Sequence, residues 1–332
     1  MTPTNHDRLS ISPFRVDSLA AASPEAPDWL WRGYLAPGQL TLLTSLWKSG
    51  KTTLLSVLLA RMKGGGDLLG MTVRPTRVLI LSEENRNLWA MRQQRLDIGG
   101  HAQVICQPFG GKKPADADWR SLLDQSAGLL GTEGSRLLVI DTVATLMPTG
   151  VETNADCMVR ALAPLRGLAA QGIAIWLMHH PHKGKPRAGQ WSRGSGSLPA
   201  SVDVALEMHL WCPDDIFDRR RLLLGWSRHQ ETPRRQLIEW TADGTGYLVL
   251  DETVDPAFER AWSTIRRVLS DFEDPQTAEA ILRDWPPDSP PPSHATLHRW
   301  LTRAVDLRWL CQEPSTRRNE PHHYWLPEAE QE

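Results

Sequence analysis

Residues 45–52, with the sequence SLWKSGKT, have the residue types and spacing of a phosphate-binding loop. The segment follows an apolar stretch at 40–43 and precedes another that begins at Leu54, so we predict a strand, a loop and a helix. A loop that opens a helix points backbone N–H groups at an anion, and the helix dipole favours negative charge there. Lys51 would reach the β- and γ-phosphates, and the Thr52 hydroxyl suits Mg²⁺, which prefers oxygen ligands. The predicted nucleotide-binding residues are Ser45, Leu46, Trp47, Lys48, Ser49, Gly50, Lys51, Thr52 and Thr53.

This loop departs from the general pattern G-x-x-x-x-G-K-[ST] at its first position, where Ser45 replaces glycine. We expect this position to lie in a strained turn without the conformational freedom that glycine gives. The alternative interpretation of the octet is an ordinary Lys-Ser-Gly turn. The flanking strand and helix patterns favour the phosphate-binding loop.

An aspartate ends a later apolar run. Asp141 follows the run at 137–140, about 90 residues after the phosphate-binding loop. In a parallel sheet, ligands bind at the carboxyl ends of the strands, so this carboxylate can hold Mg²⁺ directly or through water, across from Thr52. The alternative is an aspartate that only caps the next loop, and the upstream loop favours the metal role.

Two glutamates end the apolar run at 78–81, which is the first run after the predicted loop and helix. Either Glu83 or Glu84 could orient or deprotonate the water that attacks the γ-phosphate. Side chains alternate along a strand, so only one of them should face the nucleotide, and we prefer Glu84. Alternatively, both are solvated acids that favour the N-terminus of the following helix.

A histidine pair and a basic segment follow the apolar run at 173–178. His179 or His180 could donate a hydrogen bond to the γ-phosphate and report its loss. A metal site is the weaker interpretation, because no cysteine or carboxylate accompanies these histidines at ligand spacing. Residues 182–200 contain no acid and four glycines, which predicts either a contact with a nucleic-acid backbone or a solvated lid. The candidate DNA-binding residues here are Lys183, Lys185, Arg187 and Arg193.

These side chains require a sheet that brings them together. From residue 29 onward, short apolar runs alternate with helical stretches, which predicts an α/β fold with a mostly parallel sheet and crossover helices. After residue 204, apolar runs joined by short polar turns predict antiparallel strands that extend the sheet. We therefore expect a loose arm at 1–28, an ATPase-type core domain at 29–252 and a smaller domain at 253–332.

The composition limits the classes of function. The formal net charge is −2, so any contact with nucleic acid must come from local basic patches. The first residues have no apolar core of a signal peptide, and no apolar run is long enough to span a bilayer. We predict a cytoplasmic protein with no membrane partner. The four cysteines have no C-x-x-C pair, which argues against disulfides and zinc and predicts buried thiols.

The C-terminal segment resembles a winged helix-turn-helix module. An amphipathic helix with apolar positions from Phe258 to Leu269, ending near Asp271, is followed by a second helical stretch and by a helix that Ser293 caps, with Leu297 and Leu301 on its apolar face. Residues 309–327 read as two strands around a polar turn. Such modules also serve as protein-interaction modules, but the local arginine excess suits phosphate contact. The candidate duplex-binding residues are Arg299, Arg303, Arg317 and Arg318.

In their order along the chain, these motifs resemble the RecA-like ATPases and, within them, the plasmid replicative helicases of the RepA type. The resemblance covers roughly residues 29–250 and is carried by SLWKSGKTTLL, VLILSEEN, LLVIDTVATL, LMHHPHKG and RGSGSLPASVDVALEM. It implies that the loop binds ATP, that Glu84 is the catalytic carboxylate and that Asp141 belongs to the Mg²⁺ site. It also implies that His179 or His180 is the phosphate sensor.

The same resemblance implies a homo-oligomeric ring, expected to be a hexamer, with ATP at the subunit interfaces. An arginine then reaches the neighbour's γ-phosphate and stabilises transition-state charge. The string GWSRHQETP makes Arg228 the candidate for this residue, with Arg193 second.

We therefore expect an ATP-hydrolysing motor that acts on DNA, as a replicative or mobile-element helicase. Single-stranded DNA would bind at the core, and duplex DNA at the C-terminal module. One alternative is a recombination or KaiC-like signalling ATPase of the same fold that hydrolyses ATP without unwinding. Another is a nucleotide-gated DNA-binding regulator. A small-molecule kinase is less favoured, because no separate acceptor-site motif stands out.

Overall fold

The computed structural model describes residues 15, 27–151, 154–181, 198–212, 217–250, 256–272, 274–287, 289–306, 309–313 and 321–327. The chain divides into two compact units. The first contains residues 1–207 and 225–234, and the second contains residues 208–224 and 235–332. The domain boundary that we predicted near residue 253 lies in 251–255, outside the described residues.

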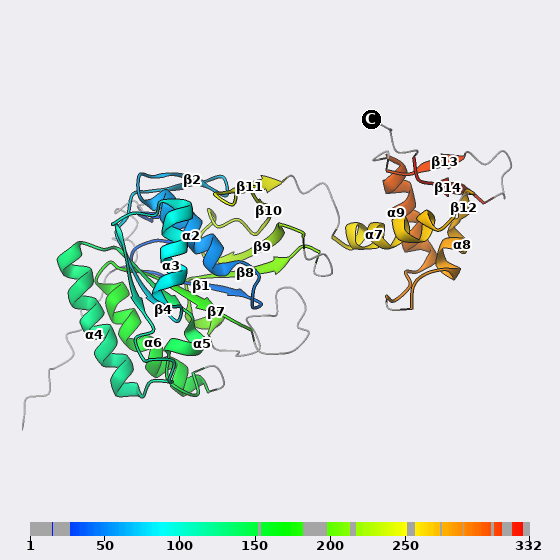
Figure 1. Cartoon of the computed structure of the whole chain (residues 1–332). Helices are drawn as coiled ribbons and strands as arrows, with labels where there is room; N and C mark the ends of the chain where they lie inside the picture. The colour runs from blue at the N-terminus through cyan, green and yellow to red at the C-terminus, as the bar shows by residue number, and fades with distance from the viewer. Residues whose placement is uncertain are drawn as a thin grey trace, which may run out of the picture. The chain divides into compact units, whose positions relative to one another are not determined.

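The centre of the fold is a nine-stranded sheet with the strand order β11-β10-β9-β8-β1-β7-β6-β4-β5 (Figure 1). Five neighbouring strands of this sheet pair in parallel. They are β1 (Leu40–Ser45), β7 (Ala174–His179), β6 (Leu137–Asp141), β4 (Val78–Ser82) and β5 (Ala102–Cys106). All but the edge strand β5 are buried along their whole length, as expected of parallel strands covered on both faces. The predicted parallel sheet is confirmed.

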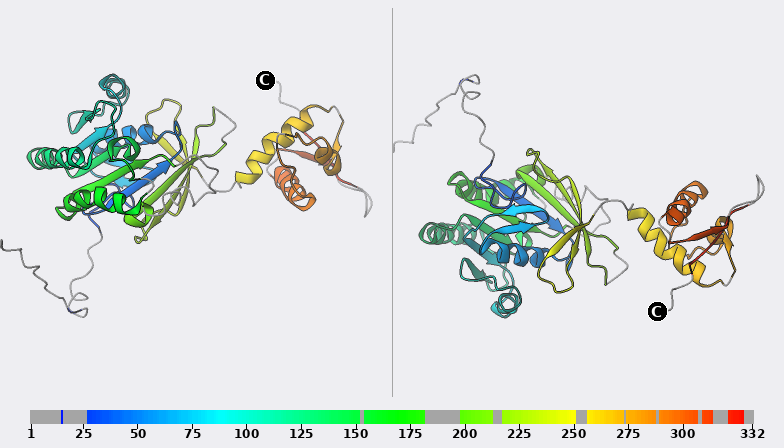
Figure 2. Two further views of the ribbon diagram at one scale, coloured as in Figure 1. Left: turned by 90° about the horizontal axis from the view of Figure 1, so that it is seen from below. Right: turned by 90° about the horizontal axis from the view of Figure 1, so that it is seen from above.

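Helices lie on both sides of the parallel strands (Figure 2). One face is covered by α2 (Lys51–Met62) and α3 (Arg86–Leu96). The other is covered by α4 (Asp116–Glu133), α5 (Val143–Leu146) and α6 (Ala155–Ala170). On this second face, alternate strand residues such as Leu42, Leu138 and Leu177 share one apolar core with Trp119 and Leu165 of the helices.

Beyond β1, the sheet continues through β8 (Val204–Leu210), β9 (Arg220–Ser227), β10 (Arg235–Trp240) and β11 (Tyr247–Leu250). The last three strands pair in antiparallel fashion, which confirms the predicted extension. A short hairpin of β2 (Gly66–Leu68) and β3 (Met71–Val73) follows α2, and a 3₁₀ turn, η2 (Pro199–Ser201), precedes β8.

The C-terminal segment has its own apolar core, around Phe258, Ile265, Ile281, Leu297 and Leu301. Three helices enclose it: α7 (Pro256–Ser270), α8 (Ala278–Arg283) and α9 (His294–Asp306). A small antiparallel sheet has the order β12 (Gln276–Thr277), β14 (His323–Trp325), β13 (Cys311–Glu313). The predicted helices and strands are present, and the winged-helix assignment stays a prediction.

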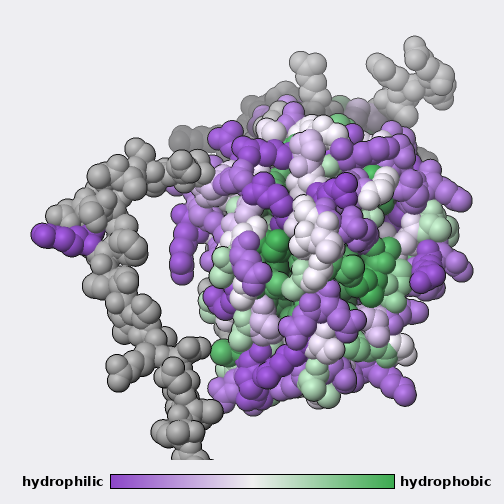
Figure 3. All heavy atoms as spheres, turned by 90° about the vertical axis from the view of Figure 1, so that its left-hand side faces the viewer, coloured by the Kyte–Doolittle hydropathy of each residue, from purple (hydrophilic) through white to green (hydrophobic). Residues whose placement is uncertain are grey.

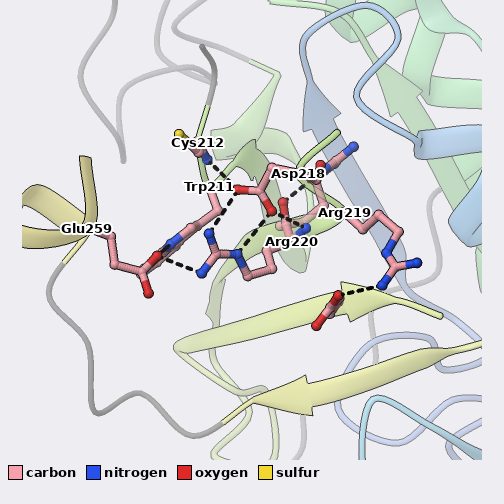
Figure 4. A network of polar contacts seen from close by, with 8 residues as sticks. Trp211, Cys212, Asp218, Arg219, Arg220 and Glu259 are labelled. Carbon is pink, nitrogen blue, oxygen red and sulfur yellow. Dashed lines mark hydrogen bonds and ion pairs between the residues drawn. The ribbon is translucent and has the colours of Figure 1, made fainter. Parts of the chain in front are cut away.

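A polar network within the second unit joins the end of β8, the start of β9 and α7 (Figure 4). Arg220 donates to Asp218 at 3.0 Å and to Glu259 at 2.7 Å, and the indole N–H of Trp211 also donates to Glu259. Asp218 further accepts the backbone N–H of Cys212 at 3.0 Å. Burial opposes the charge of Arg220, but its two carboxylate partners raise the pKa of its guanidinium.

The composition led us to expect no membrane-spanning helix and four buried thiols. No helix in the described ranges is long and apolar enough to cross a membrane. The face of the core in Figure 3 is mainly hydrophilic, with a smaller group of apolar side chains near its centre. The four cysteines are free, as predicted, but they are half-buried rather than buried.

Candidate active site

The carboxyl ends of four parallel strands meet at one edge of the sheet, because their registers are aligned. Thr44 of β1 pairs with His179 of β7. Asp141 of β6 pairs with Met178 of β7 on one side and with Ser82 of β4 on the other. The motifs that follow these positions therefore converge at the edge where parallel sheets bind ligands.

Residues 45–52 form the predicted loop between β1 and α2. Gly50 caps α2 with φ 105° and ψ 19°, in the left-handed region that a residue without Cβ adopts at low cost. Lys48 is also left-handed, at φ 57°. Ser45 instead ends β1 as an ordinary strand residue. Our expectation of a strained turn at Ser45 is wrong, because the left-handed positions lie three and five residues later.

The hydroxyl group of Ser45 has a role that glycine could not fill. Its Oγ accepts hydrogen bonds from Ser49 Oγ at 2.7 Å and from Lys51 Nζ at 3.1 Å. Lys51 Nζ also donates to the carbonyl oxygens of Ser45 at 2.9 Å and Leu46 at 3.1 Å. The loop therefore holds its lysine through several oxygens. Burial lowers the pKa of Lys51 to about 8, although the charges of Asp141 and Glu83 oppose the shift.

The predicted metal-binding pair is also brought together. Thr52 Oγ1 donates to Asp141 Oδ2 at 3.2 Å, so a hydroxyl and a carboxylate oxygen face the same point. Burial, and then the charges of Glu84 and Glu83, raise the pKa of Asp141 to about 7. A bound cation would stabilise the charged form of this buried carboxylate, which burial and its two acidic neighbours destabilise. No cluster of three or more His, Cys, Asp or Glu in the described residues could hold a metal alone. These residues fit Mg²⁺ that is ligated mainly by phosphate oxygens and water.

The two glutamates after β4 point to different partners. Glu83 Oε2 accepts a hydrogen bond from Thr142 Oγ1 at 3.2 Å and another from the hydroxyl of Thr145. Its charge acts on Lys51 and on His180. Glu84 instead forms an ion pair with Arg92 of α3, which donates to Oε1 at 2.8 Å. Glu83 is therefore held beside β6, whereas the carboxylate that we preferred from the sequence is paired with a helix, although its charge also acts on Asp141.

The structure also separates the two histidines. His179 is buried at the end of β7. His180 is half-buried, and its Nδ1 lies 3.0 Å from Lys51 Nζ. Burial and then the charge of Lys51 lower the pKa of His180, which favours the neutral ring, whose Nδ1 can accept a hydrogen bond from the lysine ammonium. His180 is therefore the histidine that reaches the phosphate-binding loop.

Arg228 lies far from this edge within its own chain. It is exposed in the turn after β9. The next residue, His229, contacts Gln39 through side-chain nitrogens 2.8 Å apart, and Gln39 precedes the first residue of β1. Arg228 is thus near the amino end of β1, opposite the phosphate-binding loop. Its predicted role toward a neighbouring subunit stays a prediction.

The candidate DNA-binding residues are only partly described. Arg299 is exposed on α9, and Arg303 is half-buried with its guanidinium 5.5 Å from the ring of Phe258. Ser293 Oγ accepts the N–H of Thr296 at 3.2 Å, which confirms the predicted helix cap. The other candidates lie outside the described residues: Lys183, Lys185, Arg187, Arg193, Arg317 and Arg318.

Sequence reasoning missed the residues that hold the two glutamates. Thr142 directly follows Asp141 in the run IDT, which was a usable signal for the Glu83 contact. Arg92 and Trp89 gave no such signal. They lie in a helix with little amphipathic pattern, and their contacts with Glu84 and Ser82 depend on how α3 packs.

The fold and the site together define a class of protein. In the sheet, β7 lies between β1, which leads into the phosphate-binding loop, and β6, which ends at Asp141. The next strand, β4, is followed by the turn that contains Glu83 and Glu84. With Lys51, Thr52 and Asp141 converging at the carboxyl edge, this is a RecA-like P-loop ATPase core, which binds and hydrolyses nucleotide.

The chain belongs to the AAA domain family, whose model matches residues 5–186, more than half of the 332 residues. A similar solved structure is the flagellar accessory protein FlaH from Methanocaldococcus jannaschii. It is 13% identical, with a TM-score of 0.45, and the match covers 73% of this chain and 98% of FlaH.

Proposed function

We propose that this ATPase is a ring-forming motor that acts on DNA, as a replicative or mobile-element helicase. One observation carries the proposal: His180 lies 3.0 Å from the Lys51 ammonium. The acid-free basic segment begins only three residues later, at Lys183. A change at the phosphate can therefore alter the start of the segment that we propose contacts the DNA backbone.

In the proposed hydrolysis, Lys51 moves its hydrogen bonds from the loop oxygens to the β- and γ-phosphates. Thr52 and Asp141 would hold Mg²⁺, which would supply charge stabilisation at the phosphate oxygens. Glu83 orients the attacking water and accepts its proton, since its charge acts on Lys51 and it is fixed by Thr142 and Thr145. We assign this role to Glu83 rather than Glu84 because Glu84 is paired with Arg92.

We further propose that the active unit is a ring, in which Arg228 serves the neighbouring subunit's site. Its exposed position at the far end of β1 supports a role in trans, because it cannot act on its own chain's phosphates. The test is subunit mixing. Arg228→Ala subunits should bind ATP normally but lower the rate of mixed assemblies by failing to support a neighbour's hydrolysis. Mixtures of Arg228→Ala with Lys51→Ala subunits separate a trans role from a cis role. Neither variant should hydrolyse ATP by itself, but mixed assemblies should regain activity, because an intact site in an Arg228→Ala subunit can use Arg228 of a Lys51→Ala neighbour. No recovery in these mixtures would contradict a trans role.

The helicase activity is tested by strand displacement on a forked duplex with ATP, using Lys51→Ala as the matched control. We expect ATP-dependent displacement by the wild type and none by the variant. Hydrolysis without displacement would contradict the helicase, and would leave a recombination or signalling ATPase as the better interpretation.

A DNA-binding regulator is the second candidate, favoured by the exposed Arg299 on the capped helix α9. In that case the C-terminal module would bind duplex DNA in a nucleotide-dependent way. Tight duplex binding by a protein without strand displacement, weakened by Arg299→Ala, would favour this candidate.

A further inference from the structure

A closed set of contacts surrounds Glu84 and does not belong to the proposed hydrolysis steps. Ser82 Oγ accepts the backbone N–H of Glu84 at 3.1 Å and the indole N–H of Trp89 at 3.0 Å. The guanidinium of Arg92 lies 5.0 Å from the ring of Trp89, donates a hydrogen bond to Oε1 of Glu84 and forms an ion pair with Oε2. Each of the four residues is therefore held by at least two contacts.

This network is sheltered rather than solvated. Trp89 is 7% exposed, and the side chains of Arg92 and Glu84 are only 21% and 23% exposed. A planar guanidinium that binds both carboxylate oxygens and stacks on an indole fixes direction as well as charge, which a lysine could not do. Such an arrangement differs from a surface ion pair, whose two long side chains change rotamer freely.

The network sets the direction of Glu83 through the backbone. Residues 83 and 84 are adjacent at the end of β4, and Glu83 N–H donates to the carbonyl oxygen of Asp141 at 2.7 Å. Glu84 is held toward α3, while Glu83 is held toward β6 by that bond and by the hydroxyls of Thr142 and Thr145. Residues 83 and 84 form a bend directly after β4, so the two side chains are held on different sides by these contacts.

We propose that Arg92 is a positioning residue for hydrolysis: by binding Glu84, it holds the turn at 83–84 so that Glu83 faces the nucleotide. The inference rests on the proposed role of Glu83. Without Arg92, Glu84 loses its ion-pair partner while its charge still acts on Asp141, together with that of Glu83. The turn then rearranges to expose or neutralise Glu84, and Glu83 is displaced. A displacement of about 1 Å can cost roughly 100-fold in rate.

The experiment measures kcat for ATP hydrolysis and the Kd for ATP in the full chain, for Arg92→Ala, Glu84→Gln and the double variant. We expect Arg92→Ala to lower kcat by about 100-fold while the Kd for ATP stays the same, because the loop contacts of Lys51 are separate. Glu84→Gln should retain most of the activity, since its amide oxygen still accepts from Arg92. The double variant should recover much of the loss, because no unpaired charge remains.

Normal kcat in Arg92→Ala, or no recovery in the double variant, overturns the inference. Arg95→Ala, an exposed arginine of the same helix, is the matched control and should behave as wild type. If Arg92→Ala does not fold, Arg92→Lys replaces it and should show an intermediate kcat, whereas full activity contradicts the proposal. If Glu83→Gln hydrolyses normally, the proposed function of Glu83 fails. If Glu83→Gln is inactive and Arg92→Ala is normal, only the role of Arg92 fails.

Discussion

Lys51 Nζ and His180 Nδ1 lie 3.0 Å apart, which joins the phosphate-binding loop to the strand end that leads into the basic segment. Both groups are in a sheltered site where burial lowers their pKa values. When a bound phosphate accepts hydrogen bonds from Lys51, the contact between Lys51 and His180 must change as well. The contact thus joins the nucleotide site to the segment that we propose to bind DNA.

His180→Ala should leave ATP binding intact and abolish the stimulation of hydrolysis by DNA. The ring is not needed to hold phosphate, but its contact with Lys51 reports the phosphate to the following segment. The measurement is the ATP hydrolysis rate with and without single-stranded DNA. His101→Ala is the control, because His101 bonds the carbonyl of Leu59 away from the site. Full DNA stimulation in His180→Ala would rule out this route.

Exchanging each glutamate separately tests which one activates water. Glu83→Gln should lower kcat by about 10²–10⁴-fold, the usual contribution of a general base, with little change in ATP affinity. Glu84→Gln should keep most of the activity. Steady-state hydrolysis and equilibrium ATP binding check both. The opposite pattern, with Glu84→Gln inactive, would restore the assignment that the sequence alone favours.

Ser45 should behave as a hydrogen-bond acceptor rather than as a tolerated substitute for glycine. Ser45→Ala removes the oxygen that accepts from Ser49 and Lys51, and should cost about 1 kcal/mol in the free energy of unfolding. Ser45→Gly should not improve ATP affinity, since the backbone at 45 is an ordinary strand. Denaturant unfolding and ATP titration measure these effects. Tighter ATP binding by Ser45→Gly would show that the loop is strained after all.

ATP affinity should fall as the pH rises through about 8. The pKa of Lys51 is lowered to about 8 in the free site, and bound phosphate raises it by favouring the charged form. Binding is therefore strongest below pH 8 and weakens above it, by at most about tenfold per pH unit. ATP titrations between pH 7 and 9.5 measure the slope. Lys51→Arg is the control, because its guanidinium stays charged and should give a flat profile. A flat profile for the wild type would contradict the buried lysine.

The features of the fold and of the site that could be predicted from the sequence are those that short sequence patterns determine. The loop from Ser45 to Thr52 has a defined spacing, and its flanking apolar runs identify a strand and a helix. Asp141 could be predicted near the metal site because the phosphate-binding loop about 90 residues upstream favours that role over a loop cap. The parallel order followed from helices between strands, which requires crossover connections.

The choice within each residue pair was not predictable, because it depends on packing between distant segments. Alternation along β4 allowed either Glu83 or Glu84 to face the nucleotide. In the structure, Glu84 pairs with Arg92, and Glu83 accepts from Thr142 and Thr145. The pattern of the strand does not specify these contacts. His179 was equally plausible until β7 buried it and left His180 beside Lys51.

The most direct test of the central claim measures ATP hydrolysis by the full chain, with and without single-stranded DNA, for the wild type and Lys51→Ala. We expect that DNA stimulates hydrolysis by the wild type and that Lys51→Ala hydrolyses no ATP in either condition. A wild-type rate that DNA leaves unchanged, or a Lys51→Ala variant that hydrolyses ATP at the wild-type rate, would contradict it.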